Sequence, residues 1–332
     1  MDKNEKKDIL SAFQIDSKFM HWSGNCYAKT EFTKAVHKDE LEARIIMDTY
    51  FRPNDAFLLM AVHTLSCATV DQVLLYLQLK KKRNPKLEIP VLNRDKIKQR
   101  LRFLCGQGLL LGEEYVSQKK VQVELYKCTI FGYNFFKNQL SMHLQPYDDS
   151  SVMRRGMELY KRLAVNSIGL AISAVPECKG YSFHSRQCDG FELIEKGLIY
   201  YQCKYELGNS ERIYIIEPAY FSDDERYVDE GATEDKFRKR MQKLKEMIKT
   251  YKEQQYEVGV IFALEGVGGF RKFISEIRNM DTDFFVNCLY TSENVCNKGN
   301  YELNKAFMSL RFAEGGKPTV SAVLDEWTQF LV

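Results

Sequence analysis

The sequence predicts an α+β chain of two domains, and three observations support this. A length of 332 residues with 45% hydrophobic side chains is enough for two cores. Within residues 51–145, three runs with helical periodicity precede two β-rich runs. Beyond residue 152, helices alternate with strands, which is typical of an α/β domain.

Residues 1–50 form a polar arm of mixed charge, in which KDELEARIIMDTYF predicts a helix. The charged start lacks the apolar segment of a signal peptide, and no apolar run approaches the roughly 18 residues of a transmembrane helix. The nine cysteines include no CxxC pair, and the five histidines lack metal-ligand spacing. We therefore expect a cytoplasmic protein with free thiols, no membrane association and no structural metal site.

Two helices are expected first in the domain at residues 51–145. The first follows Pro53, and its apolar positions are Phe57, Leu58, Met60, Ala61 and Leu65. The second begins near Thr69 or Asp71, either of which can serve as the N-cap. Its apolar positions are Val70, Val73, Leu74, Leu77 and Leu79.

A third helix, NRDKIKQRLRFLCGQ, follows the basic segment KKKRNPKLEIP, which is expected to be a loop because Pro85 and Pro90 prevent helix continuation. Asn93 is a suitable N-cap, and Gly106 or Gly108 ends the helix. At about 100° per residue, one face is apolar and the opposite face is polar. The core-facing residues are Ile97, Leu101 and Leu104, and the opposite face carries Asp95, Lys98, Gln99 and Arg102.

The runs LLLGEEYV and VQVELYKCT, joined by the polar turn SQKK, predict a β-hairpin after the third helix. Three helices followed by a hairpin is the element order of a winged helix-turn-helix domain, which we assign to residues 51–145. In that fold the third helix enters a DNA groove, where arginine, lysine and glutamine read base edges. Lys119 and Lys120, at the tip of the hairpin, are placed to contact phosphate.

Positive charge is concentrated between residues 80 and 102. Ten Lys and Arg residues face only Glu88 and Asp95, a local charge of +8 in a chain whose total is +3. Such a concentration is typical of a surface that binds the phosphate backbone. The alternative is a solvated basic face on a winged helix that binds protein. The predicted DNA-binding residues are Lys80, Lys81, Lys82, Arg83, Arg94, Lys98, Gln99, Arg102, Lys119 and Lys120.

The segment LQPYDDSSV, residues 144–152, interrupts the pattern and is the expected domain boundary. Residues 152–332 then predict a helix, short strands, a basic helix, a further strand and helix, and a last strand in FFVNCLYTS. This order matches the restriction-endonuclease-like core, an α/β domain. In that core, paired carboxylates hold Mg²⁺ and a lysine positions the attacking water.

Asp189 occupies the place of the first carboxylate, but the second place is incomplete. Gln202-Cys203-Lys204 keeps the spacing to lysine and replaces the acid by an amide, whereas Glu217-Pro218-Ala219 keeps the acid and lacks the lysine. The candidate catalytic residues are therefore Asp189, Glu217 and Lys204. We expect a degenerate nuclease scaffold without a cofactor, and the alternative is an active endonuclease that uses Mg²⁺.

A basic helix at residues 236–252 is the second positively charged surface. It lies beside the DNA cleft in the nuclease-like core, where it would supply nonspecific phosphate contacts. The alternative is a solvated face paired with the acidic segment SDDERYVDEGATED before it.

A family resemblance covers roughly residues 50–290. The winged helix, Asp189-Gly190-Phe191, the strand ending Ile215-Ile216-Glu217, and the helical run KLKEMIKTY resemble the replication-relaxation family of plasmids and integrative elements. The resemblance implies a DNA-binding winged helix fused to a nuclease-like domain, acting beside a relaxase in plasmid replication, relaxation or mobilisation. The family pattern has Glu-x-Asp where this chain has Glu217-Pro218-Ala219, which argues against catalysis.

The sequence therefore predicts a protein of a mobile genetic element that binds double-stranded DNA and does not cleave it. A relaxase or another protein of the element is the expected protein partner. Winged helices often form dimers, so a homodimer is compatible with the sequence, although no heptad seam sets the stoichiometry. The alternative from another class is a protein-protein adaptor without DNA affinity.

Overall fold

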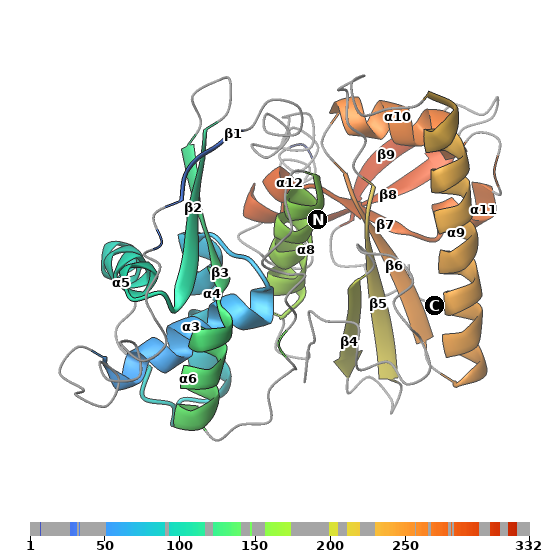
Figure 1. The fold of residues 1–332 in the computed structure, drawn as a ribbon. Helices are drawn as coiled ribbons and strands as arrows, with labels where there is room; N and C mark the ends of the chain where they lie inside the picture. The colour runs from blue at the N-terminus through green and yellow to red at the C-terminus, as the bar shows by residue number, and fades with distance from the viewer. Residues whose placement is uncertain are drawn as a thin grey trace. The chain divides into compact units, whose positions relative to one another are not determined.

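The computed structural model describes residues 7, 27–31, 33, 51–89, 93–116, 122–140, 147, 157–173, 199–204, 211–219, 230–255, 257–264, 267–277, 280, 282–298, 306–312 and 318–323. The chain divides into two compact units, whose helices and strands are labelled in Figure 1. We call Asn25–Asn166 the first unit. The second unit comprises Ser167–Val332, with which Met1–Gly24 is grouped. The predicted helix in the N-terminal arm lies outside the described residues.

The first two helices of the first unit begin where the sequence provides caps. α3 (Pro53–Leu65) has proline at its start, and the backbone N–H of Arg52 donates to the Asp55 carboxylate at 2.7 Å. α4 (Val70–Arg83) begins after Thr69, whose hydroxyl accepts from the backbone N–H of Gln72 at 3.2 Å. Of the two predicted caps of α4, the structure uses Thr69.

α5 (Arg94–Gly106) confirms the third predicted helix. The side chain of Asn93 accepts from the backbone N–H groups of Asp95 and Lys96, at 2.9 and 3.3 Å. After the helix, Gly108 adopts a φ of 75°, a conformation that costs glycine little, and the chain turns into the following strand.

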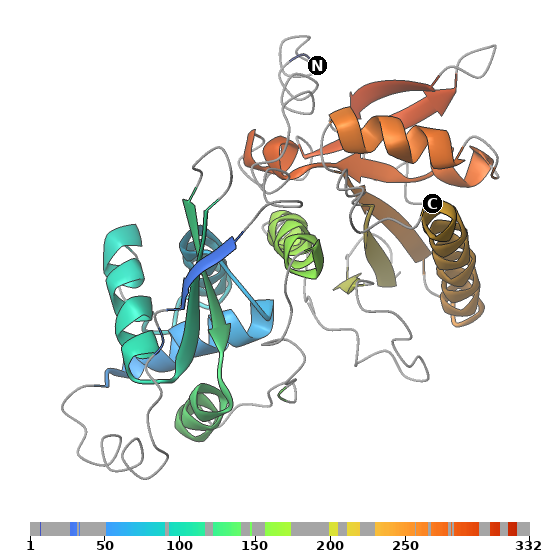
Figure 2. The same ribbon diagram turned by 45° about the horizontal axis from the view of Figure 1, so that its top comes forward.

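The predicted hairpin is formed by β2 (Leu110–Val116) and β3 (Gln122–Cys128), which pair antiparallel. β1 (Tyr27–Glu31) adds to the other edge of β2, so the sheet order is β1-β2-β3. Ala68, between α3 and α4, forms an isolated bridge with Tyr126 of β3 through two backbone hydrogen bonds of 3.0 Å. Figure 2 shows α5 along one side of this sheet.

α6 (Ile130–Leu140) and α8 (Met157–Ser173) follow the hairpin. In α8, the side-chain amide of Asn166 donates to the carbonyls of Leu65 and Cys67 at 3.0 and 2.6 Å. The Gln72 side chain in turn donates to the Leu163 carbonyl at 2.9 Å. These bonds hold the first part of α8 to the first unit. The division between the two units falls within α8, after Asn166, whereas the sequence places the boundary at residues 144–152.

The second unit contains a six-stranded mixed sheet in the order β4-β5-β6-β7-β8-β9. β5, β6 and β7 are parallel, and the remaining neighbours pair antiparallel. The strands are β4 (Ile199–Lys204), β5 (Glu211–Pro218), β6 (Glu257–Ala263), β7 (Leu289–Thr291), β8 (Phe307–Phe312) and β9 (Pro318–Val323).

One face of this sheet packs against helices. α9 (Glu230–Glu253) connects β5 to β6 and runs beside the sheet in Figure 1. α10 (Val267–Ile277) and α11 (Thr282–Val286) connect β6 to β7, and α12 (Glu293–Lys298) follows β7. The shared core includes Ile215, Phe237, Met241, Leu244, Phe262, Phe273, Phe285 and Tyr290. Ile216 and Ile261, on the opposite face, are also fully buried.

Three local predictions are wrong. Lys80 to Arg83 belong to the last turn of α4 and not to a loop, because basic residues stabilise the carbonyl end of a helix. The residues FFV form the end of α11, and only Leu289–Thr291 form the strand, since short apolar runs suit either structure. α9 begins at Glu230, so part of the acidic segment is helical, as acidic residues favour a helix N-terminus. The sequence also missed β8 and β9.

Candidate nucleic-acid interface

α5 has one buried and one exposed face, as predicted. Ile97, Leu101 and Leu104 are at most 6% exposed and anchor the helix in the core of the first unit. Asp95, Gln99 and Arg102 are exposed on the opposite side. The helix therefore presents a carboxylate, an amide and a guanidinium to solvent, which is the kind of face that reads base edges in a groove.

The cations on the hairpin side of α5 share one acid. Lys98 and Arg102 both form ion pairs with Glu124 of β3, with Lys98 Nζ 2.9 Å from the carboxylate. The Tyr126 hydroxyl donates to the same carboxylate at 2.7 Å. The Glu124 side chain is 9% exposed, whereas that of Arg102 is 50% exposed. Lys98 and Arg102, both predicted to bind DNA, thus share an ion-pair partner, Glu124, that the sequence did not predict.

The protonation of this cluster follows from its contacts. Burial by itself raises the pKa of Glu124, but hydrogen bonds from Arg102, Lys98 and Tyr126 together lower the pKa below its usual value. The hydrogen bond from Arg102 to Glu124 raises the pKa of the guanidinium. Burial and the bond to Glu124 raise the pKa of Tyr126. At neutral pH Glu124 is therefore ionised, Arg102 carries its positive charge and the Tyr126 phenol is neutral.

Two further arginines of α5 have acidic partners. Arg94 contacts Asp71 of α4 through Nε at 2.6 Å, on the surface. Arg100 contacts the fully buried Asp55 of α3 through both Nε and Nη2, at 2.6 and 2.5 Å. Arg100 therefore joins two helices, and its charge is balanced inside the unit. Arg94 is the predicted DNA-binding residue of the two, and its surface ion pair is of the weak, exchangeable kind.

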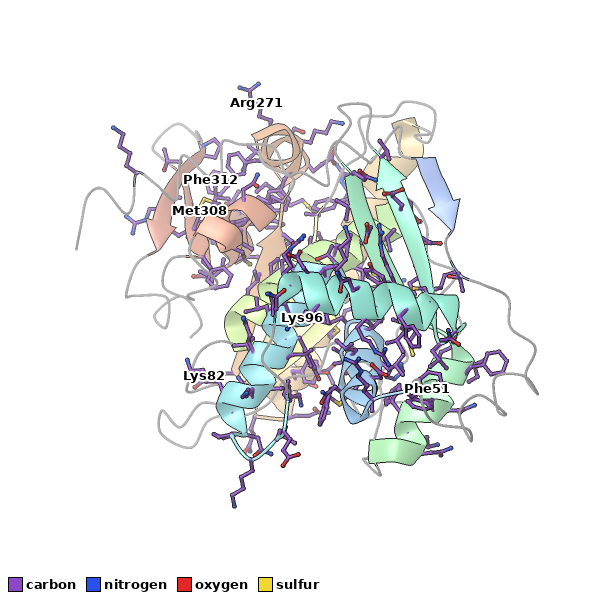
Figure 3. All side chains as sticks on the ribbon, turned by 90° about the vertical axis from the view of Figure 1, so that its left-hand side faces the viewer. Phe51, Lys82, Lys96, Arg271, Met308 and Phe312 are labelled. Carbon is purple, nitrogen blue, oxygen red and sulfur yellow. The ribbon has the colours of Figure 1, made fainter. Side chains whose placement is uncertain are left out.

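The cations at the end of α4 and the start of α5 differ in their contacts. Lys81 donates to the Ile89 carbonyl at 2.9 Å, and Lys80 lies 5.7 Å from the ring centre of Tyr76. Lys82, Lys86 and Lys96 are exposed, and within the described part of the chain none of these three forms an ion pair. Figure 3 labels Lys82 and Lys96. Lys86 and Lys96, which were outside the predicted set, are therefore available to phosphate.

A hollow of about 460 Å³ lies on the flank of α5 away from the hairpin. Its residues include Lys96, Gln99 and Phe103 of α5, together with Leu58 of α3 and Ile89. Gln99 thus borders this hollow, whereas Lys98 and Arg102 contact Glu124 of the hairpin.

The remaining predicted site residues lie elsewhere or outside the described residues. Lys119, Lys120 and Asp189 are outside them. Lys204 is the last residue of β4, where its backbone pairs with Glu211, and its side chain is not among those described. Glu217, near the end of β5, is 1% exposed and forms an ion pair with Arg240 of α9. Glu217 is therefore held inside the second unit by a cation from the adjacent helix.

α9 is only partly a basic surface. Its buried face carries Phe237, Met241, Leu244 and Met247, while Arg240 turns inward to Glu217 and is 16% exposed. Lys245 lies 4.9 Å from the ring centre of Phe284. Arg238, Lys239 and Lys249 are exposed. Fewer cations of this helix are thus available to phosphate than its sequence suggests.

The described residues contain no group of three His, Cys, Asp or Glu side chains that is able to hold a metal ion. Five cysteines, Cys67, Cys105, Cys128, Cys288 and Cys296, are buried and free of disulfide bonds. Burial raises the pKa of the Cys105 thiol to about 12, so it is protonated at neutral pH. None of the described helices has the length and apolar character that crossing a membrane requires.

Comparison with known proteins identifies no relative. No family model, curated protein or solved structure matches the chain. Its function is therefore inferred from the geometry and charge of the described residues.

Proposed function

We propose that the protein binds double-stranded DNA through its first unit, which we interpret as a winged-helix domain. The order α3, the Ala68 bridge, α4, α5 and the β2–β3 hairpin supports this interpretation. In a helix-turn-helix protein the second helix of the motif enters the major groove. That helix corresponds to α5 here, and the hairpin beside it corresponds to the wing.

One observation carries the proposal. α5 is anchored by an apolar face and exposes Gln99 and Arg102. Lys96, also on α5, and Lys82 and Lys86, on the segment before it, are exposed without ion pairs among the described residues. The amide and guanidinium suit base edges, and the ammonium groups suit phosphate. A helix used only for packing needs neither.

The second unit is proposed to be a nuclease-like scaffold that aids DNA or protein contact without cleaving DNA. The ion pair between Glu217 and Arg240 favours a structural role for this carboxylate, since it leaves Glu217 only 1% exposed. Following the resemblance described above, we propose that the protein is an accessory factor of a mobile element and acts beside a relaxase.

The proposal is tested by fluorescence anisotropy with a labelled DNA duplex over a salt series. A Lys82→Ala/Lys86→Ala/Lys96→Ala variant is compared with wild type. Each lost phosphate contact should reduce the slope of log K against log salt by about 0.9. We expect the triple variant to bind more weakly. If all three lysines contact phosphate, its slope of log K against log salt should be smaller than that of wild type by about three times 0.9.

The matched control is Lys252→Ala on the exposed face of α9, which removes a positive charge from the second unit. It should bind like wild type, whereas weaker binding would indicate that α9 also contacts phosphate. Failure of the wild type to bind duplex at about 50 mM salt would refute the proposal and favour the adaptor function. Strand scission that appears only with Mg²⁺ would favour the endonuclease.

A further inference from the structure

The carboxylate of Glu124 has all its acceptor positions occupied. Its Oε1 accepts from Lys98 Nζ at 2.9 Å and from Arg102 Nη2. Its Oε2 accepts from Arg102 Nε at 3.2 Å and from the Tyr126 hydroxyl at 2.7 Å. An ionised carboxylate offers about four acceptor positions. These contacts therefore fill them.

Because its acceptor positions are occupied, Glu124 is unsuited to contact DNA bases itself. A glutamate in the major groove is able to accept from the N4 amine of cytosine, but only with an acceptor position left for it. Glu124 has its positions filled and is 9% exposed, and its charge repels phosphate. It is suited to act on DNA through the side chains that it holds.

Glu124 fixes the orientation of the Arg102 side chain. Its guanidinium is bonded through Nε and Nη2 to one carboxylate, and two bonds to a rigid planar group fix the plane of that group. The side chain nevertheless remains 50% exposed on α5. Arginine pairs most often with guanine, through O6 and N7 together. An arginine already held in place loses less conformational entropy when it forms such a pair.

We infer that Glu124 is a positioning residue that orients Arg102 to read guanine, so that the preferred DNA has a G·C pair opposite α5. This inference rests on the proposed DNA-binding function and names the substrate class of the same site. Lys82, Lys86 and Lys96 contact phosphate and supply affinity. Arg102 supplies discrimination between sequences, and Glu124 makes that discrimination depend on the hairpin.

The test begins with selection of bound sequences from a randomised duplex pool by the wild-type protein. Each guanine of the selected site is then replaced, one at a time, by 7-deazaguanine, which lacks the N7 acceptor. We expect one replacement to weaken wild-type binding about tenfold. The same replacement should change binding of Arg102→Lys and Glu124→Gln by less than about twofold, since neither retains the oriented fork.

Glu114→Gln is the matched control. Glu114 lies directly across the hairpin from Glu124 and accepts a hydrogen bond from Gln122, so this variant makes the same change of charge without touching Arg102. It should retain the wild-type response to 7-deazaguanine. Glu124→Gln should lose about tenfold in its preference for the selected site over random duplex.

Two results would overturn the inference while leaving DNA binding intact. In the first, the wild type selects a site but tolerates 7-deazaguanine at every position. In the second, Glu124→Gln and Glu114→Gln discriminate equally, so that only net charge matters. A wild type that binds no duplex would instead refute the proposed function itself. Arg102→Lys keeps the positive charge at an exposed position but loses the planar fork, so it keeps the test decisive if Glu124→Gln fails to fold.

Discussion

Single residues of the first unit derive their role from a partner on another element. Glu124 brings together Lys98 and Arg102 of α5, and Asp55 of α3 holds Arg100. These acids remove positive charge from a surface whose sequence carries +8 between residues 80 and 102. The charge available to phosphate is therefore smaller than the sequence suggests, and among the described residues it includes Lys82, Lys86 and Lys96.

The lowered pKa of Glu124 predicts a pH dependence of stability. A carboxyl whose pKa is lower in the folded state contributes stability above its unfolded pKa of about 4.3, and this contribution is lost as the pH falls through the folded pKa. Glu124→Gln should therefore be less stable than wild type at pH 7, and the difference should shrink below about pH 4. Urea unfolding at both pH values measures it. A difference that stays constant with pH would contradict this prediction.

At the scale of elements, the contact between α6 and the start of the hairpin depends on a glycine. A Cβ at Gly132 would lie 2.1 Å from the Leu109 carbonyl oxygen, a backbone atom that cannot move aside cheaply. Thr129, just before α6, donates through its hydroxyl to the carbonyls of Gly108 and Leu109 at 2.8 and 2.9 Å. α6 is thus joined to the hairpin by polar contacts that leave no room for a side chain.

We expect Gly132→Ala to destabilise the first unit by about 1–3 kcal/mol, because the methyl group must displace backbone. Gly106→Ala, in the last turn of α5, is the control. No heavy atom lies within 4 Å of its added Cβ, so it should be neutral or should stabilise by about 0.5–1 kcal/mol. Chemical denaturation of both variants measures the difference. Equal effects would indicate that α6 and the hairpin separate to admit a side chain.

At the scale of the whole molecule, each unit has its own core. The first unit buries Leu59, Val62, Leu65, Leu101 and Leu104, all fully inaccessible. The second buries aromatic rings, with Phe262 of the central strand 4.9 Å from Phe273 and 5.6 Å from Tyr290 between ring centres. Separate cores are the condition for separate unfolding transitions.

Calorimetry of the whole chain should accordingly resolve two transitions. Asp55→Ala leaves Arg100 without its buried partner. It should lower the unfolding temperature of the first unit, with a loss of about 3–5 kcal/mol in its free energy of unfolding. Phe262→Ala leaves a cavity in the core of the second unit and should lower the unfolding temperature of that unit, with a comparable loss of stability. If each variant lowers both transitions equally, the chain unfolds as one cooperative unit and the prediction is wrong.

Features that depend on neighbouring residues could be predicted from the sequence. The N-caps Thr69 and Asn93, the buried face of α5 and the β2–β3 hairpin were all predictable, because capping and periodicity act within a few residues of the chain. The α+β class followed from the order of these elements. The end of α4 and the strands β8 and β9 were missed, since short or charged segments fit more than one local structure.

Which charged side chains form ion pairs depends on how the folded chain brings separate elements together. Glu124 is 22 residues from Arg102, and Asp55 is 45 residues from Arg100. Arg240 of α9 likewise points to Glu217 of β5 rather than to solvent. A pattern within one helix identifies its polar face but not the acid that packs beside it, because ion pairing depends on the approach of separate elements. The candidate site was therefore predictable as a basic helix, and its division into paired and exposed cations was not.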